Sequence, residues 1–394
     1  MKKTKRQRDV PEIRFPGFTD SWEQRKVFEI ADRFDNLRVP VAANLRIPGN
    51  TPYYGANGIQ DYVEGYTHDG EYILVAEDGA SDLKNYPVNY VNGRIWVNNH
   101  AHVLQGKEKI ANNKFLSYAM RLADIESVLV GGGRAKLNAD IMMNLDIAIP
   151  SFNEQEQIGA YFSNLDNLIT LQERKCRVLR ELKKCMLQKM FPKNGSDIPE
   201  IRFPGFTDSW EQRKVGELLE ERNEQAPMSE DYPLMAFIAN QGVAPKGERY
   251  DRSALVNDET GKKYKRTEFG DFIYSSNNLE TGSIGLNKYG NACISPVYSI
   301  FKPTGKAELD FLGRRFLRKD FINEMVRWRQ GVVYGQWKIH ETDFMKIEVR
   351  IPSIDEQKKI GQYFDSLDDL IALQERKCKV LRELKKCMLQ KMFV

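Results

Sequence analysis

Apolar residues recur at alternating three- and four-residue spacing between residues 152 and 191. Such a pattern over about five heptads predicts one long helix with a coiled-coil seam. The apolar positions are Ile158, Tyr161, Phe162, Leu165, Leu168, Ile169, Cys176, Leu179, Leu182, Met186 and Met190. Pro192 and the stretch KNGSD end the helix. A helix over 155–191 would be roughly 55 Å long, at about 1.5 Å per residue.

The same helical pattern returns over 353–394. Two amphipathic helices in one chain bury their seams most simply against each other, so we expect an antiparallel coiled coil. Gln172 and Gln374 interrupt the two seams at matching positions. A polar residue in a seam can fix the register of the pair.

Outside these helices, short runs rich in β-branched and aromatic residues predict strands over 71–79, 93–104, 270–277 and 293–301. Helical patterns follow at 114–129 and 310–328. Each half of the chain is therefore expected to be an α+β domain followed by a long helix.

The chain repeats itself. PEIRFPGFTDSWEQRKV occurs at 11–27 and again, unchanged, at 199–215. The 27 residues 165–191 return at 367–393 with three differences, and IPSFNEQEQIGAYF at 149–162 matches IPSIDEQKKIGQYF at 351–364. A repeat of this length excludes a short-period solenoid. We expect domains over 1–150 and 199–352, helical segments over 151–191 and 353–394, and a linker over 192–198.

Between these matching segments the two halves diverge, and TPYYGANGIQDYVEGY has no recognisable counterpart in the second half. Near-identical ends around different middles indicate that the ends share one task while the middles discriminate two targets. Trp22 and Trp210, inside the identical segments, are expected to be packing residues, because a shared residue cannot distinguish two targets.

Composition narrows the class of protein. The net charge is only +4, but 165–191 carries seven basic and three acidic residues, and 367–393 carries seven and four. No apolar run reaches the roughly 20 residues of a membrane helix, and the basic N-terminus lacks the apolar stretch of a secretion signal. The five cysteines form no C-x-x-C pair, which favours reduced thiols and a cytoplasmic protein.

Two variable α+β domains alternating with near-identical helices resemble the specificity subunit of Type I restriction–modification systems. PYYGANGI, NNHAHVL, SNNLETGSIG, SPVYSIF and the paired IPS-(F/I)-x-EQ runs carry the resemblance over essentially the whole chain. It implies that each variable domain reads half of a bipartite double-stranded DNA target through the major groove. It further implies that the helices act as a ruler and dock two methyltransferase subunits, which restriction subunits join.

The sequence offers no catalytic motif. The Asn/Asp-Pro-Pro-Tyr/Phe motif and the glycine-rich S-adenosylmethionine loop of a methyltransferase are both missing. GVAPKGER at 242–249 lacks the Lys-Ser/Thr of a P-loop, and His340-Glu341 lacks the second histidine of a zinc helix. We therefore expect a non-enzymatic chain that binds neither cofactor nor metal, with S-adenosylmethionine held by the methyltransferase.

Candidate DNA contacts are the polar residues of Gly- and Asn-rich loops, because Arg, Lys, Asn and Gln read base edges and Lys, Arg, Ser and Tyr hold phosphates. In the first domain they are Tyr53, Tyr54, Asn57, Asn98, Asn99, His100, Arg134, Lys136 and Asn138. In the second they are Gln241, Lys262, Lys263, Tyr264, Lys265, Arg266, Ser276, Asn277, Asn278, Tyr334, Gln336 and Lys338. Tyr53 and Tyr54 fit a core position equally well.

Two alternatives stay open: a coiled-coil scaffold that binds two proteins without DNA, and an unfamiliar DNA-modifying enzyme with two active sites. The basic helix faces could meet DNA phosphates or acidic patches of partner subunits, and we favour partners. The base sequence recognised depends on loop geometry that no residue spacing encodes.

Overall fold

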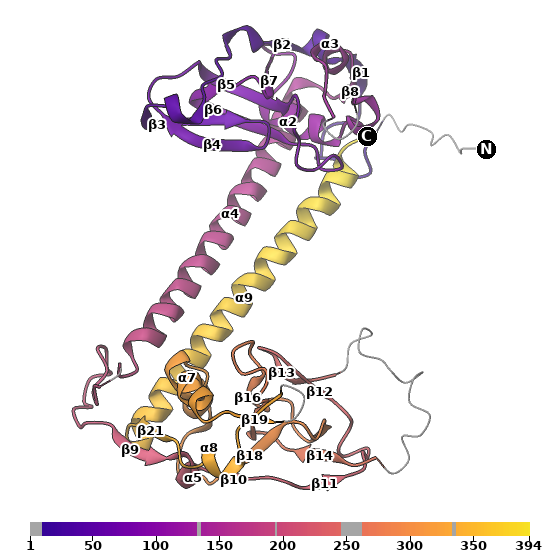
Figure 1. Cartoon of the computed structure of the whole chain (residues 1–394). Coiled ribbons are helices and arrows are strands. Elements are labelled where there is room, and N and C mark those ends of the chain that lie inside the picture. Colours follow the sequence, from indigo (N-terminus) through magenta and orange to yellow (C-terminus); the bar gives the residue numbers. More distant parts are fainter. Residues whose placement is uncertain (1–9, 132–134, 194, 246–261, 333–335) are drawn as a thin grey trace. The chain divides into compact units, whose positions relative to one another are not determined.

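The computed structural model describes residues 10–131, 135–193, 195–245, 262–332 and 336–394, and it confirms an α+β fold (Figure 1). The chain divides into two compact units. Unit 1 combines residues 1–174 with 374–394, and unit 2 comprises residues 175–373. Each unit therefore contains one variable domain, the first part of the helix that follows it and the last part of the other long helix.

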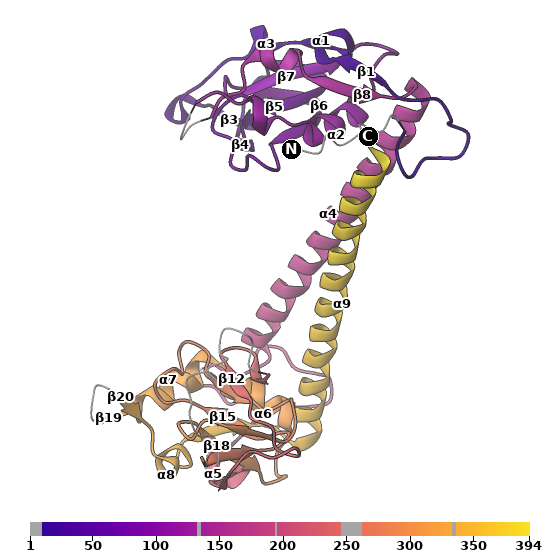
Figure 2. The same ribbon diagram turned by 90° about the vertical axis from the view of Figure 1, so that its right-hand side faces the viewer.

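Unit 1 is built around a six-stranded sheet in the order β2-β7-β5-β6-β3-β4. Helix α2 packs against β5, β6 and β7 (Figure 2). Its elements are β1 (Glu23–Lys26), α1 (Val27–Ile30), β2 (Ala31–Arg33), η1 (Asp35–Leu37), η2 (Ala43–Leu45), β3 (Pro48–Gly55), β4 (Gly58–Val63), β5 (His68–Ala76), β6 (Val88–Val97), β7 (Ala101–Gly106), α2 (Asn113–Leu122), η3 (Glu126–Val128), α3 (Ala139–Met143) and β8 (Asp146–Ile149).

The run YILVA in β5 is apolar throughout because both faces of this strand are covered. Ile73 and Val75 belong to the main core with Trp22 and Phe115. Tyr72 and Leu74 point into a smaller core on the other side. Side chains alternate across a strand, so a strand buried on both faces needs apolar residues at every position.

Unit 2 carries a four-stranded sheet, β10-β18-β15-β16, and a three-stranded one, β11-β14-β17. Its elements are β9 (Glu211–Lys214), α5 (Val215–Leu218), β10 (Leu219–Glu221), β11 (Gln225–Ala226), β12 (Ala236–Ile238), β13 (Gly242–Ala244), β14 (Tyr264–Thr267), β15 (Phe272–Tyr274), β16 (Ile284–Leu286), β17 (Ala292–Ile294), β18 (Ser299–Pro303), α6 (Leu309–Phe316), α7 (Lys319–Arg327), β19 (Gln330–Val332), β20 (Gln336–Lys338), α8 (Glu341–Phe344) and β21 (Glu348–Ile351).

The long helices are α4 (Phe152–Lys189) and α9 (Ile354–Met392), close to the predicted spans. In unit 1, Asp166 and Glu173 of α4 pair with Lys385 and Arg382 of α9, so the helices run in opposite directions there. Unit 2 repeats this arrangement, because Lys183 pairs with Asp368 while Phe191 packs against Phe364. The predicted antiparallel pairing is confirmed within each unit.

The identical segment 11–27 joins its domain to the start of the following helix. Strand β1 pairs with β8, which directly precedes α4. Arg14 donates from Nε and Nη2 to the two carboxylate oxygens of Glu154 at 2.7 and 2.8 Å, and Glu154 is fully buried. Arg202 and Glu356 repeat this pair in unit 2 at 2.7 Å for both bonds. The Glu of each EQ run thus connects the repeated segment to its helix.

The end of the other long helix completes each core. In unit 1, Phe393 packs against Trp22, Phe115 and Phe162. In unit 2, Phe191 takes the same place against Trp210, Phe311 and Phe364. Trp22 and Trp210 are buried, as expected of packing residues. Each helix end fills the same aromatic socket, formed by one tryptophan and two phenylalanines, which accounts for the near-identity of the two helix ends.

Three details differ from the sequence predictions. Strands predicted over 93–104 and 293–301 are each two strands, because Asn98–His100 and Ser295–Tyr298 lie outside strands. The helix predicted over 310–328 is divided into α6 and α7. Leu168 and Leu182, assigned to the seam, are 47% and 36% exposed.

The predicted seam positions Leu165, Ile169 and Cys176 are buried. The side-chain oxygens of Gln172 and Gln374 are shielded from solvent without a partner in the described part of the chain. Their predicted role in register stays a prediction.

Candidate DNA interface

The three candidate loops of the first domain lie together with the loop that follows β5. Asn57, in the β3–β4 turn, donates to the carbonyl of Gly79 at 2.9 Å and accepts from the amide of Ser81 at 2.8 Å. Asp78 forms a β-bridge with Lys136, and its carboxylate is 2.6 Å from Nδ1 of His100. Loops separated by up to 80 residues in the sequence therefore form one polar surface, on which Asn57 and Lys136 are exposed.

Three other candidates of this domain are buried or half-buried, and three are exposed or not described. Tyr53 is 1% exposed, and its hydroxyl accepts from the amide of Val41 at 2.9 Å. Tyr54 is half-buried, and burial raises its pKa. Asn98 is 4% exposed and accepts from the amide of His100 at 2.8 Å, which shapes the turn. Asn99 and Asn138 are exposed. Arg134 lies outside the described residues.

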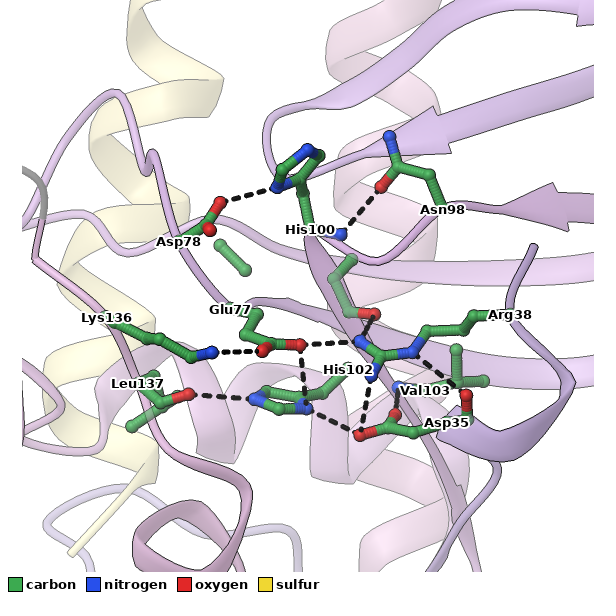
Figure 3. A network of polar contacts seen from close by, with 12 residues as sticks. Asp35, Arg38, Glu77, Asp78, Asn98, His100, His102, Val103, Lys136 and Leu137 are labelled. Carbon is green, nitrogen blue, oxygen red and sulfur yellow. Dashed lines mark hydrogen bonds and ion pairs between the residues drawn. The ribbon is translucent and has the colours of Figure 1, made fainter. Parts of the chain in front are cut away.

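A network of charged groups that sequence reasoning missed lies beside this surface (Figure 3). His102 is 2% exposed, with Nδ1 2.7 Å from Asp35 Oδ2 and Nε2 2.9 Å from the carbonyl of Leu137. Glu77 accepts from Arg38 at 2.7 Å and pairs with Lys136 at 2.8 Å. The network holds β7, the η1 loop and the Lys136 segment together.

Both carboxylates of the network stay readily ionised. Burial raises the pKa of Asp35, but the hydrogen bonds from His102 and from the amide of Val103, together with the charge of Arg38, outweigh it and hold that pKa below its ordinary value. Burial likewise opposes ionisation of Glu77, whose pKa is lowered by hydrogen bonds from Lys136 and Arg38. The only sign of this network in the sequence was that acidic residues and histidines adjoin the apolar runs of predicted strands, in VAEDG and NNHAHVL.

In the second domain, the structure brings the Ser276–Asn277 loop to the β19–β20 hairpin. The amide of Trp337 donates to Asn277 Oδ1 at 2.6 Å, and that of Ile339 donates to Ser276 Oγ at 3.0 Å. The hairpin residues Gln336 and Lys338 are exposed, as is Asn278. Tyr334 lies outside the described residues.

The candidates on β12–β13 and β14 are more dispersed. Gln241 is exposed, and its turn contacts the same loop through the amide of Asn240, which donates to Gly282. Lys262 and Lys263 are exposed, and Lys262 lies 5.7 Å from the ring centre of the buried Tyr264. Lys265 is 7% exposed, donates to the carbonyl of Tyr298 at 3.0 Å and has its pKa lowered by burial. Arg266 pairs with Glu224 at 2.6 Å.

The two domains share a framework that their sequences conceal. Strand β2 pairs Arg33 with Leu104, and β10 pairs Glu221 with Phe301, so β7 and β18 are equivalent strands. Lys136 precedes the buried Leu137, and Lys338 precedes the buried Ile339; a short helix, α3 or α8, follows in each case. Both lysine side chains are 48% exposed. Corresponding loops therefore form the candidate surface in each unit.

Within the described ranges, no group of three or more His, Cys, Asp or Glu side chains could hold a metal ion. No helix in those same ranges is long and apolar enough to cross a membrane.

Comparison with known proteins agrees with the duplicated architecture. The family model for the type I restriction modification DNA specificity domain matches residues 19–181 and again 207–383. A putative type I restriction enzyme specificity subunit of Haemophilus influenzae is 30% identical over 356 residues and covers 88% of each chain. The MjaVIII specificity subunit of Methanocaldococcus jannaschii is 24% identical and covers 72% of this chain and 70% of its own.

The crystal structure of a type I restriction–modification S subunit from M. genitalium shares the fold, with a TM-score of 0.66 at 15% identity over 98% of this chain and 99% of that one. The family model matches both domains, and the Haemophilus relative aligns along 88% of both chains. The chain therefore belongs to the family of DNA specificity subunits of type I restriction–modification systems.

Proposed function

We propose that the chain directs a type I complex to a bipartite double-stranded DNA target, each unit reading one half-site. It performs no catalysis and binds no cofactor. S-adenosylmethionine and the methyl transfer belong to the methyltransferase partner, and the complex acts in the cytoplasm. The observation that carries this proposal is the pair of equivalent polar surfaces, one on each unit, whose residues differ between the units.

The long helices support a proposal about partners. Four apolar positions are 36–58% exposed on each helix, at the same places of the repeat: Leu168, Leu171, Val178 and Leu182 on α4, and Leu370, Leu373, Val380 and Leu384 on α9. Their spacing puts them on one helical stripe. Exposed apolar stripes mark protein contacts. Two identical stripes fit two identical subunits, so one methyltransferase would dock on each helix, and restriction subunits would join that core.

The scaffold alternative accounts for the stripes but not for the paired polar surfaces, and it lies outside the family to which the chain belongs. The basic residues of the helices have a partly structural role, because Lys183, Arg382 and Lys385 pair with acidic residues of the opposing helix. The remaining exposed cations of the helices would face the partner subunits.

The test exchanges the variable domains. Residues 216–348 are replaced by residues 28–146, so that both units carry the variable residues of unit 1. The Arg–Glu pairs are unchanged in this chimera. Phe115 takes the place of Phe311 in the aromatic socket of unit 2, and Asp146 takes the place of Glu348 at the start of β21. With the cognate methyltransferase it should methylate a palindromic interrupted site made of the first half-site twice, in inverted orientation.

Genome-wide mapping of methylated bases provides the measurement, and circular dichroism with complex formation confirms that the chimera folds. A folded, assembled chimera that still methylates the original asymmetric site contradicts the proposal.

A further inference from the structure

The turn before β7 and the turn before β18 occupy the same place in the two domains and have the same length. Leu104 and Phe301 are equivalent, because β2 and β10 pair with them in the same register. The preceding strands, β6 and β17, end at Val97 and Ile294, each seven residues earlier. His100 of unit 1 therefore corresponds to Val297 of unit 2.

The environment of each residue supports this equivalence. In β5, Val75 faces His102, and in β15, Tyr274 faces Ser299. Asp78 lies three residues after Val75, and Asn277 lies three residues after Tyr274, so Asp78 and Asn277 are at equivalent positions. Asp78 bridges to the Lys136 segment, and Asn277 accepts from the amide of Trp337, the residue before Lys338. The two turns thus lie beside equivalent loops in the two domains.

The chemistry at the tip of the turn is different in the two units. The His100 side chain is 36% exposed, and its ring is oriented by Asp78 at Nδ1 (Figure 3). Its Nε2 has no hydrogen-bond partner within the described residues and can form a bond with a ligand. Val297 is 73% exposed and follows Pro296. A hydrogen-bonding group in one unit is replaced by an exposed apolar one in the other.

Shared and differing residues suit different parts of a DNA contact. Phosphate contacts carry no sequence information, so a lysine common to both units, Lys136 or Lys338, suits the backbone. Base edges in the major groove differ in hydrogen-bonding groups, and thymine alone presents a methyl group there. Residues that read two different half-sites must differ between the units, as His100 and Val297 do.

We propose that His100 and Val297 are equivalent base-reading residues, His100 forming a hydrogen bond at Nε2 with a polar base edge and Val297 contacting the methyl group of a thymine. This inference rests on the proposed function and adds to it the residues that determine specificity. It assigns one thymine to the half-site read by unit 2 and one hydrogen-bonded base to the half-site read by unit 1.

The experiment measures the methylated motif of the full chain with its methyltransferase, for the wild type and for Val297→Ser, Val297→Thr, His100→Ala and His100→Gln. In Val297→Ser, which removes both methyl groups of the side chain, discrimination should fall about tenfold at one thymine of one half-site, because a single mismatched pair typically costs this much or more. Val297→Thr differs from it by one methyl group and should retain the preference. His100→Ala should relax one position of the other half-site, and His100→Gln, which keeps a hydrogen-bonding group, should affect no position other than that one.

Both side chains are exposed, so the thermal unfolding of the variants should match that of the wild type. An unchanged motif in the variant of Val297 that lacks both methyl groups or in His100→Ala, or a uniform loss of methylation across all sequences in a folded and assembled complex, would overturn the inference. The domain exchange separates this outcome from failure of the proposed function. If the exchange alters the motif and these substitutions do not, the bases are read elsewhere on the same surface.

Discussion

Glu154 and Glu356 are fully buried carboxylates, and each is held by one arginine of the repeated segment. A buried charge is tolerated only when its partner and geometry are supplied by the fold. The sequence showed that the segment with the arginine and the EQ run with the glutamate are both repeated. It could not identify Arg14 as the partner of Glu154, because these residues are 140 positions apart.

Removing Arg14 should destabilise unit 1. Arg14→Ala leaves Glu154 buried without its partner, and such a change costs about 3 kcal/mol of the free energy of unfolding. Urea unfolding followed by circular dichroism measures the loss. The control is Arg25→Ala in the same segment, whose ion pair with Glu23 lies on the surface and should contribute little. Equal stability of the two variants would contradict the role given to Arg14.

The Asp35–Glu77 network should make unit 1 sensitive to acid. Both carboxylates have folded-state pKa values below their ordinary range. The stability they contribute is therefore present at neutral pH and is lost as the pH falls below about 4 and through those lowered values. Hydrogen exchange of β7 against pH measures the loss. Asp35→Asn should flatten the pH dependence of this exchange. The control Asp69→Asn, at an exposed partner of Arg94, should leave the pH dependence unchanged.

The long helices show how one periodic pattern can contain two surfaces. The apolar residues of α4 divide into a buried set, such as Leu165 and Ile169, and an exposed set, such as Leu168 and Leu171. Periodicity identifies the apolar positions of a helix, but the crossing of the opposing helix decides which of them are covered. The sequence therefore predicted one seam where the structure has a seam and a stripe.

A charge placed in the stripe should remove a partner. Leu171→Glu should weaken binding of one methyltransferase by at least about tenfold, because a carboxylate would have to be desolvated in the contact. Combining it with Leu373→Glu should remove both subunits. Native mass spectrometry counts the subunits bound, and Thr170→Glu, at the adjacent exposed position, is the matched control. Two methyltransferases still bound to the double variant would exclude the stripes as docking surfaces.

At the scale of the whole molecule, α4 and α9 each run from one compact unit into the other. The chain crosses between the units twice through continuous helix. Elements of this kind suit a ruler between two half-sites.

Lengthening both helices should therefore lengthen the gap between the half-sites. Duplicating LQER at 171–174 and at 373–376 adds four residues to each helix at matching positions of the repeat. At about 1.5 Å per residue this adds about 6 Å, and with base pairs about 3.4 Å apart the unspecific gap should grow by one or two pairs. Both half-site sequences should persist. Active methylation with an unaltered gap would refute the ruler.

Local pattern and repetition determined much of this protein. The duplication, the two long helices, the α+β class, the packing role of Trp22 and the polar loops follow from residue types and spacing along the chain. Tertiary structure decided which loops meet, that Tyr53, Asn98 and Lys265 are buried, that His102 joins two carboxylates, and that His100 and Val297 are equivalent. The physical reason is that these properties depend on contacts between residues far apart in the sequence. Strand register and helix crossing create those contacts, and neither has a period that can be detected along the chain.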